Sequence, residues 1–97
     1  MRDLKVHSRA QEDLLEIWRY IAKDNVSAAN RVGDEIDATI HELCQMPGIG
    51  HTRRDVKRPQ YRFKNVFSYV IVYRYDDKTL TVIRVVHGRR NFRRLFR

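Results

Sequence analysis

Residues 61–91 read YRFKNVFSYVIVYRYDDKTLTVIRVVHGRRN, and this stretch decides the fold. Two segments of it, Tyr69–Tyr75 and Thr79–His87, are rich in the β-branched and aromatic residues that suit a pleated, half-buried surface. The polar residues 76–78 between them have the length of a hairpin turn. Apolar residues occupy both faces through the middle of the segments, which is typical of central strands covered on each side. Alternation predicts that one face of the second segment carries Leu80, Val82, Arg84 and Val86.

Length and composition set the class of protein. The chain has 97 residues, which is enough for one domain with a modest core. Its single cysteine, Cys44, cannot form an internal disulfide, and this fits a reducing cytoplasm. No apolar run approaches the roughly 20 residues of a membrane span, and the N-terminus lacks the apolar segment of a signal peptide. We therefore expect a cytoplasmic protein with no membrane association.

Charge is distributed very unevenly along the chain. Residues 1–52 contain six Lys and Arg against nine Asp and Glu, whereas residues 53–97 contain fourteen against three. The second half therefore carries a net charge of +11, and the whole chain +8. A block this basic requires an acidic partner, either nucleic acid or an acidic protein. Composition does not choose between the two.

The first half of the chain has the pattern of a helical hairpin, spanning about residues 9–46. Residues 4–7 alternate like a short strand, and Ser8 with Gln11 makes a capping-box pattern for a first helix. Its buried stripe is predicted to include Trp18, while Asp13 faces away with the other acidic residues. The full stripe is Ala10, Leu14, Ile17, Trp18 and Ile21.

The second helix follows a turn at residues 24–27 and runs to Met46, where Pro47 and Gly48 end it. Because the connection is short, the two helices should be antiparallel neighbours. Gly33 lies in the middle of this helix, where it costs about 1 kcal/mol relative to Ala, and we expect it to allow close helix approach. The predicted inner face is Ala29, Val32, Ile36, Thr39, Ile40, Leu43 and Met46.

A basic loop over residues 47–60 leads into a strand at 61–64 and then into the hairpin. Residues 91–97 should form a helical turn or an ordered tail, with Phe92, Leu95 and Phe96 against the sheet and Arg93, Arg94 and Arg97 in water. The element order is β-α-α-β-β-β. The predicted fold is a single α+β domain, in which a helical hairpin packs on a small, mainly antiparallel sheet, and residues 61–97 supply the sheet and basic tail.

No metal or cofactor site is expected. The four histidines are scattered, and Cys44 has no partner at ligand spacing. Metal-free cleavage of a phosphodiester needs a base, an acid and cations on the phosphorane, but the sheet offers many cations and few proton donors. This composition favours an electrostatic binding face. His87 is the one proton shuttle available, although we expect it to be hydrogen-bonded to backbone.

Four stretches together resemble one family. SRAQEDLLEIWRYIAKDN at residues 8–25, PGIG at 47–50, SYVIVYRYDD at 68–77 and IRVVHGRRN at 83–91 are similar to segments of ParE toxins, in the same order. These belong to the RelE/ParE superfamily of bacterial type II toxin–antitoxin systems. The resemblance implies the β-α-α-β-β-β fold and growth inhibition by poisoning of DNA gyrase. It also implies a hetero-oligomer with a ParD-like antitoxin that neutralises the toxin.

The RelE-like branch of the superfamily instead cleaves ribosome-bound mRNA. By resemblance, two of its lysines fall on Arg62 and Lys64, and an arginine falls on Arg90. Its central-strand arginine, however, matches Val70, and its C-terminal tyrosine matches Phe96. Loss of one such group costs about 10²–10³-fold in rate, so the resemblance favours a gyrase-binding protein with no catalytic residues. The alternative is a metal-independent endoribonuclease that uses Arg62, Lys64, His87 and Arg90.

Two sets of contact residues follow from charge and exposure. Gyrase, its DNA or both should contact the basic strand end and tail, through Arg84, His87, Arg89, Arg90, Arg93 and Arg94. An acidic, partly disordered antitoxin segment that folds on binding should cover part of the helical hairpin and the sheet edge. Its candidate contacts are Arg53, Arg54, Arg58, Tyr69, Tyr73, Phe92 and Phe96. A plain nucleic-acid-binding module is a third, weaker reading.

Overall fold

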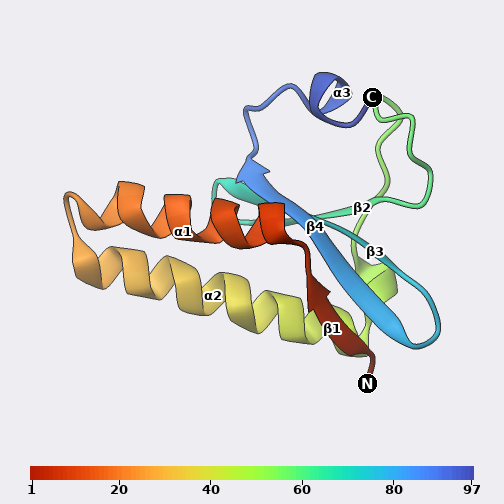
Figure 1. The fold of residues 1–97 in the computed structure, drawn as a ribbon, viewed down its shortest axis with the longest axis horizontal. Helices are drawn as coiled ribbons and strands as arrows, with labels where there is room; N and C mark the ends of the chain where they lie inside the picture. The colour runs from red at the N-terminus through yellow and green to blue at the C-terminus, as the bar shows by residue number, and fades with distance from the viewer.

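The predicted hairpin forms the two central strands of a four-stranded sheet. The computed structural model describes all residues, 1–97, and shows the α+β arrangement expected from the sequence (Figure 1). The strand order is β1-β4-β3-β2, with β1 parallel to β4 and the other pairs antiparallel. None of the helices is long and apolar enough to cross a membrane. The elements are β1 (Asp3–Val6), α1 (Ser8–Ala22), α2 (Val26–Gln45), the 3₁₀ turn η1 (Pro47–Ile49), β2 (Arg62–Val66), β3 (Tyr69–Tyr75), β4 (Thr79–His87) and α3 (Phe92–Leu95).

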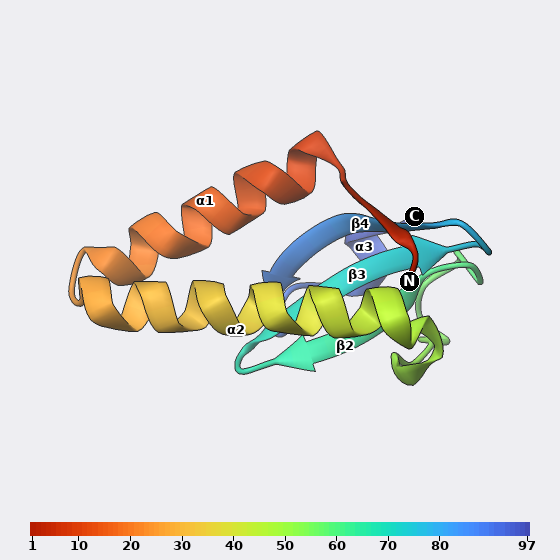
Figure 2. The ribbon, with the colours of Figure 1, turned by 90° about the horizontal axis from the view of Figure 1, so that it is seen from below.

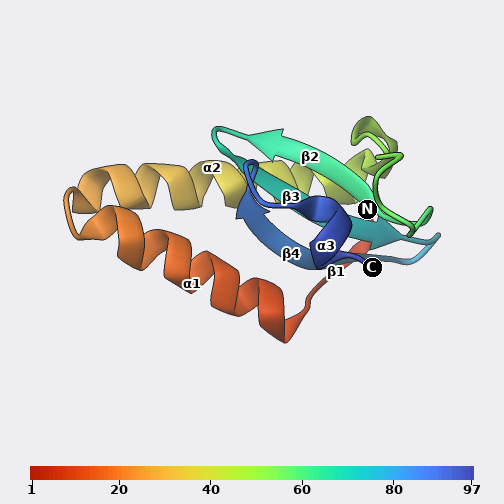
Figure 3. The same ribbon diagram turned by 90° about the horizontal axis from the view of Figure 1, so that it is seen from above.

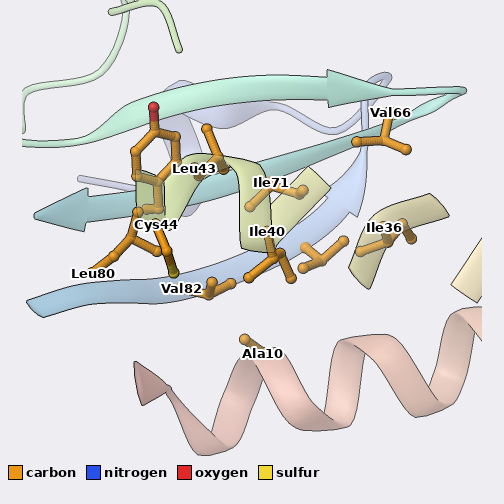
Figure 4. Close-up of a cluster of buried hydrophobic side chains, with 11 residues drawn as sticks. Ala10, Ile36, Ile40, Leu43, Cys44, Val66, Ile71, Leu80 and Val82 are labelled. Carbon is orange, nitrogen blue, oxygen red and sulfur yellow. The ribbon is translucent and has the colours of Figure 1, made fainter. Parts of the chain in front are cut away.

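The sheet is covered on both faces, as its apolar central strands predict. The helical hairpin α1–α2 lies on one face, and α3 with the preceding loop lies on the other (Figures 2 and 3). On the helical face, Ala10 of α1 and Ile40 and Leu43 of α2 point toward the sheet (Figure 4). The opposite face carries a smaller cluster, made of Val56, Phe63, Val70, Val72, Val86, Phe92 and Phe96. Each sheet face therefore has its own apolar core.

A bulge in β4 changes the predicted alternation. Val72 pairs with Arg84, but the next residue, Tyr73, pairs with Val82, so Ile83 is an extra residue in β4. Val85 therefore joins Leu80 and Val82 on the helical face, and Val86 turns to the α3 face. Strict alternation had placed Val86 with Leu80. The correction follows because one inserted residue exchanges the faces of all later side chains.

Asp13 is buried rather than solvent-facing, contrary to the prediction. Its carboxylate accepts two hydrogen bonds from Arg84, at 2.7 and 3.1 Å, and one from the backbone N–H of Val85, at 3.0 Å. Pairing with β1 ends at Val82, so the next part of the β4 edge lacks a strand partner. The carboxylate of α1 supplies that missing acceptor.

Trp18 is 38% exposed, which corrects its assignment to the core. The helical hairpin extends well beyond the end of β4, so its far half has no sheet beneath it (Figure 1). Leu14 and Ile17 are only half-buried for the same reason, and Met46, at the other end of α2, is exposed. The Trp18 indole nitrogen donates to Asn30 on α2, at 2.9 Å. Trp18 therefore links the two helices at their surface.

Two local predictions in the helices are also corrected. The N-cap of α1 is His7, whose Nδ1 accepts from the Arg9 N–H, and Gln11 donates to the Val6 carbonyl instead of completing a capping box. Gly33 is not a point of close approach, because a Cβ added there would meet no heavy atom within 4 Å. Its missing side chain leaves open space beside α1.

Tyr73 anchors the turn that follows α2. Its hydroxyl donates to the Pro47 carbonyl, at 2.5 Å, and accepts from the Gly50 N–H, at 3.0 Å. The side chain is fully buried, and this burial raises the pKa of the phenol. A Cβ at Gly50 would lie 2.3 Å from the hydroxyl oxygen, so the contact requires glycine.

We predict that Gly50→Ala lowers the free energy of unfolding by about 1–3 kcal/mol, because the added methyl overpacks this contact. Gly33→Ala is the matched control. It adds the same methyl in open space and should raise stability by up to about 1 kcal/mol through helix propensity. Urea unfolding followed by circular dichroism measures both. Equal effects of the two substitutions would contradict this account of Tyr73 and Gly50.

Candidate functional site

Exposed cations gather where β4 ends and the chain turns back over the sheet. Residues 88–97 cross the face opposite the helices and lie beside the loop before β2 (Figure 3). Arg58 of that loop donates to the Arg97 carbonyl, at 2.8 Å, which joins the two segments. We call these exposed cations, together with the half-buried Arg53, the basic rim: Arg53, Arg54, Lys57, Arg58, Arg89, Arg90, Arg93, Arg94 and Arg97.

Buried aromatic residues hold the basic rim in place. Phe92 and Phe96 pack against Phe63, with ring centroids 5.8 and 6.2 Å away. The Arg53 guanidinium lies 4.2 Å from the Phe92 ring centroid and makes two hydrogen bonds to Asp55, at 2.9 and 2.8 Å. These bonds to Arg53 lower the pKa of Asp55. The cations beyond Arg53 therefore rest on an ordered surface.

A shallow hollow of about 480 Å³ lies between the loop and α3. Four cations line it, namely Lys57, Arg93, Arg94 and Arg97, together with Asn91 and Asp55. The single carboxylate is already paired with Arg53, at 2.8 Å. The free guanidinium groups present planar donors that match phosphate or carboxylate oxygens. The hollow is thus suited to an anionic macromolecule.

His87 is hydrogen-bonded to backbone, as expected. Its Nδ1 accepts from the Arg89 N–H, at 3.1 Å, and its ring meets Tyr69 edge-on with 5.7 Å between centroids. A neutral ring in this position carries its proton on Nε2. The residue is half-buried and lies in a cleft between α1 and the end of β4, which Arg90 and Tyr20 also line.

The structure does not bring the four nuclease candidates together. Arg62 pairs with Tyr73 and donates to the Gly50 carbonyl, at 2.9 Å, whereas His87 pairs with Tyr69. Tyr69 and Tyr73 are four residue steps apart on β3, which is about 13 Å along the strand. Lys64 lies between them on the edge strand, and only His87 and Arg90 share a cleft.

Four predicted contact residues are not available to a partner. Arg84 is 13% exposed and is held by Asp13, which removes it from the target-binding set. Tyr73, Phe92 and Phe96 are buried in the chain's own cores, which corrects their assignment as antitoxin contacts. The remaining candidates are accessible: Arg53, Tyr69 and His87 are half-buried, and Arg54, Arg58, Arg89, Arg90, Arg93 and Arg94 are exposed.

An apolar groove on the helical hairpin was not predicted. It has a volume of about 320 Å³ and lies between α1 and α2. Gly33 and Trp18 are the two sequence signals that could have indicated it, since one leaves space and the other is an incompletely covered aromatic residue. The apolar residues that line it are Leu14, Ile17, Trp18, Ala29, Ile36 and Ile40.

No three His, Cys, Asp or Glu side chains are grouped so that they could hold a metal ion. Cys44, on α2, faces the core on the helical side of the sheet, and burial raises the pKa of its thiol.

Comparison with known proteins gives consistent results. The family model described as the ParE toxin of the type II toxin–antitoxin system, parDE, matches residues 4–92. The chain is 32% identical to Toxin ParE1 of Caulobacter vibrioides over 94 residues, covering 96% of each chain. It is 29% identical to Toxin ParE3 of the same organism over 80 residues, covering 81% of this chain and 79% of that one.

Two solved structures share the fold. The chromosomal ParDE toxin–antitoxin system from P. aeruginosa superposes with a TM-score of 0.73 at 21% identity, covering 90% of this chain and 96% of that chain. The RelBE2 toxin–antitoxin complex from Mycobacterium tuberculosis gives a TM-score of 0.59 at 20% identity, covering 89% and 96%.

We predict that Arg84 acts in stability rather than in recognition. Asp13→Ala leaves a buried guanidinium and a backbone N–H without their acceptor, and should cost about 3–5 kcal/mol of unfolding free energy. Glu16→Ala, one turn further along α1 and exposed, should change stability by no more than about 0.5 kcal/mol. Urea unfolding of both variants measures the difference. If Asp13→Ala unfolded like the wild type, Arg84 would be free to bind a target.

Proposed function

Because the chain belongs to the ParE family of type II toxin–antitoxin toxins, we propose that it stops growth by binding DNA gyrase and trapping it on cleaved DNA. The observation that carries this proposal is the basic rim. Arg89, Arg90, Arg93 and Arg94 are exposed, and none of them forms an ion pair within the chain. Such groups are free to pair with phosphates of gyrase-bound DNA or with carboxylates of gyrase.

The geometry supports binding in preference to RNA cleavage. Val70 and Phe96, which stand where RelE-like toxins have an arginine and a tyrosine, are both buried on the α3 face. Arg62 is engaged with Gly50, far from His87. A cleaving enzyme needs its cations and proton donors around one phosphate, and of the four nuclease candidates only His87 and Arg90 line the same cleft.

We further propose that a ParD-like antitoxin neutralises this toxin through two surfaces. Its acidic residues would pair with the basic rim, and an amphipathic segment would place apolar side chains in the groove between α1 and α2. Two facts support this occupant. The two solved structures compared above are both toxin–antitoxin systems. The groove is apolar and open because Gly33 contributes no side chain.

The gyrase proposal predicts that Arg89→Ala combined with Arg90→Ala, Arg93→Ala and Arg94→Ala weakens gyrase inhibition by at least about 10-fold, through lost charge pairing. Inhibition is measured as loss of supercoiling, together with accumulation of cleaved plasmid. The matched control is Arg74→Ala with Lys78→Ala, which removes exposed charges at the opposite end of the β3–β4 hairpin. The control should inhibit like the wild type.

The same proteins are assayed for mRNA cleavage in a translating extract. Cleaved mRNA with gyrase unaffected would reject the gyrase proposal and establish the endoribonuclease alternative. In that case cleavage should disappear on His87→Ala or Arg90→Ala, since these residues share the cleft.

The antitoxin proposal predicts that Gly33→Leu abolishes co-purification with the cognate antitoxin, because leucine fills the groove. The fold should be retained, since Leu is the better helix former by about 1 kcal/mol. Ala38→Leu, on an exposed part of the same helix, is the size-matched control and should bind normally. Unchanged capture of the antitoxin by Gly33→Leu would exclude the groove as its binding site. Gyrase inhibition by Gly33→Leu should remain intact.

A further inference from the structure

Phe67 combines a strained backbone conformation with an exposed aromatic side chain, and packing within the fold explains neither. It lies in the two-residue turn between β2 and β3, since Val66 and Tyr69 form the last pair. Its φ is 54°, and it is the only non-glycine residue with a positive φ. This conformation favours glycine and costs about 1–2 kcal/mol for other residues. Its ring is 63% exposed, so it adds little to either core.

The surroundings of Phe67 are basic. The turn adjoins the end of β4, because the Gly88 N–H donates to the Ser68 carbonyl, at 2.8 Å. A hollow of about 380 Å³ there is lined by Phe67, Asn65, His51, His87, Arg53 and Arg89 among others, and no carboxylate lines it. Arg53 also donates a hydrogen bond to Asp55, and Asp55 lines the hollow between the loop and α3 described above. The Arg53–Asp55 ion pair thus contributes one residue to the lining of each hollow.

We propose that this side of the molecule binds a single-stranded nucleic acid, with an unpaired base stacked on Phe67 and phosphates held by Arg89, Arg93, Arg94 and Arg97. Proteins that bind single strands combine a cationic groove with exposed aromatic rings, since every base has a face that stacks. A base on Phe67 would leave the following phosphates over the arginines of the rim.

The composition of the surface favours a nucleic acid over an acidic protein. Five of its six cations are arginines, whose planar donors match phosphate oxygens, and its one carboxylate is paired. Besides Phe67, only Tyr69 and Val70 are apolar among the 10 residues that line the hollow, so the ring has little apolar surface around it to form a protein interface core. Stacking needs only the exposed ring.

This inference extends the proposed gyrase activity but is tested without gyrase. Fluorescence anisotropy would measure binding of labelled 12-nucleotide oligo(dT), oligo(U) and a DNA duplex to the full chain. Phe67→Gly removes the ring and relieves the backbone conformation, so it should be at least as stable as the wild type. We expect it to weaken single-strand binding about 10-fold or more, with no effect on the duplex. Phe67→Trp should restore binding.

Arg93→Ala with Arg94→Ala should reduce the slope of log affinity against log salt by about 1.4, since each phosphate contact on a single strand contributes about 0.7. Arg74→Ala with Lys78→Ala should leave the slope unchanged. The ratio of oligo(dT) to oligo(U) affinity identifies whether the bound strand is DNA or RNA, and a bound strand of either kind supports the inference.

Equal single-strand binding by Phe67→Gly and the wild type would overturn the inference and leave a plain electrostatic surface. Binding of polyglutamate with no binding of either oligonucleotide would also overturn it, in favour of an acidic protein partner. If wild type fails to inhibit gyrase but binds oligonucleotides through Phe67, the proposed function fails and this inference stands.

Discussion

A buried carboxylate holds the two layers of this fold together. Asp13 of α1 accepts hydrogen bonds from Arg84 and from the Val85 N–H at the point where β1 no longer pairs with β4. Without this acceptor, the β4 edge would have an unsatisfied N–H and a buried guanidinium, both of which are costly. The interaction allows β4 to run on past its partner strand. As a result, His87 and the arginines that follow it, Arg89 and Arg90, lie at one end of the sheet.

The two faces of the sheet differ in the size of their cores and in the elements that cover them. The helical face has the larger core and an overhanging hairpin, with an apolar groove between its two helices. The α3 face has only seven core residues, and its cover is a short helix and an irregular loop. Because this cover is only a short helix and a loop, the cations of the basic rim lie directly above the few aromatic rings of the core. Arg53 illustrates this arrangement, since it lies on Phe92 and pairs with Asp55 at the surface.

Local patterns predicted the elements, and long-range contacts decided where the predictions were wrong. The hairpin strands, both helices and the anchoring of the tail by Phe92 and Phe96 follow from periodicity, so they were foreseeable. The same anchoring conflicted with giving these two residues to the antitoxin, and the structure resolves the conflict in favour of burial. Asp13 was misassigned because its partner Arg84 is 71 residues away, and no local pattern reveals such a pair.

The exposure of Trp18 depends on where the hairpin lies along the sheet, and no local pattern gives that position. Element lengths do not decide it, because the 20-residue α2 and the nine-residue β4 both span about 30 Å. The bulge at Ile83 was beyond prediction, because it depends on the register between β3 and β4. The site was thus predicted better in its charges than in its geometry.

The separation of groove and basic rim bears on how a toxin of this shape would be neutralised. The groove lies between α1 and α2, and the rim lies on the face of the sheet opposite the helices. A flexible antitoxin segment that engages both surfaces gains affinity, because the second contact forms within the same complex at high effective concentration. Such a segment would displace an anionic target from the rim by competing for the same arginines. Its apolar anchor would meanwhile remain out of the target's reach, so release of the rim alone would leave the antitoxin bound.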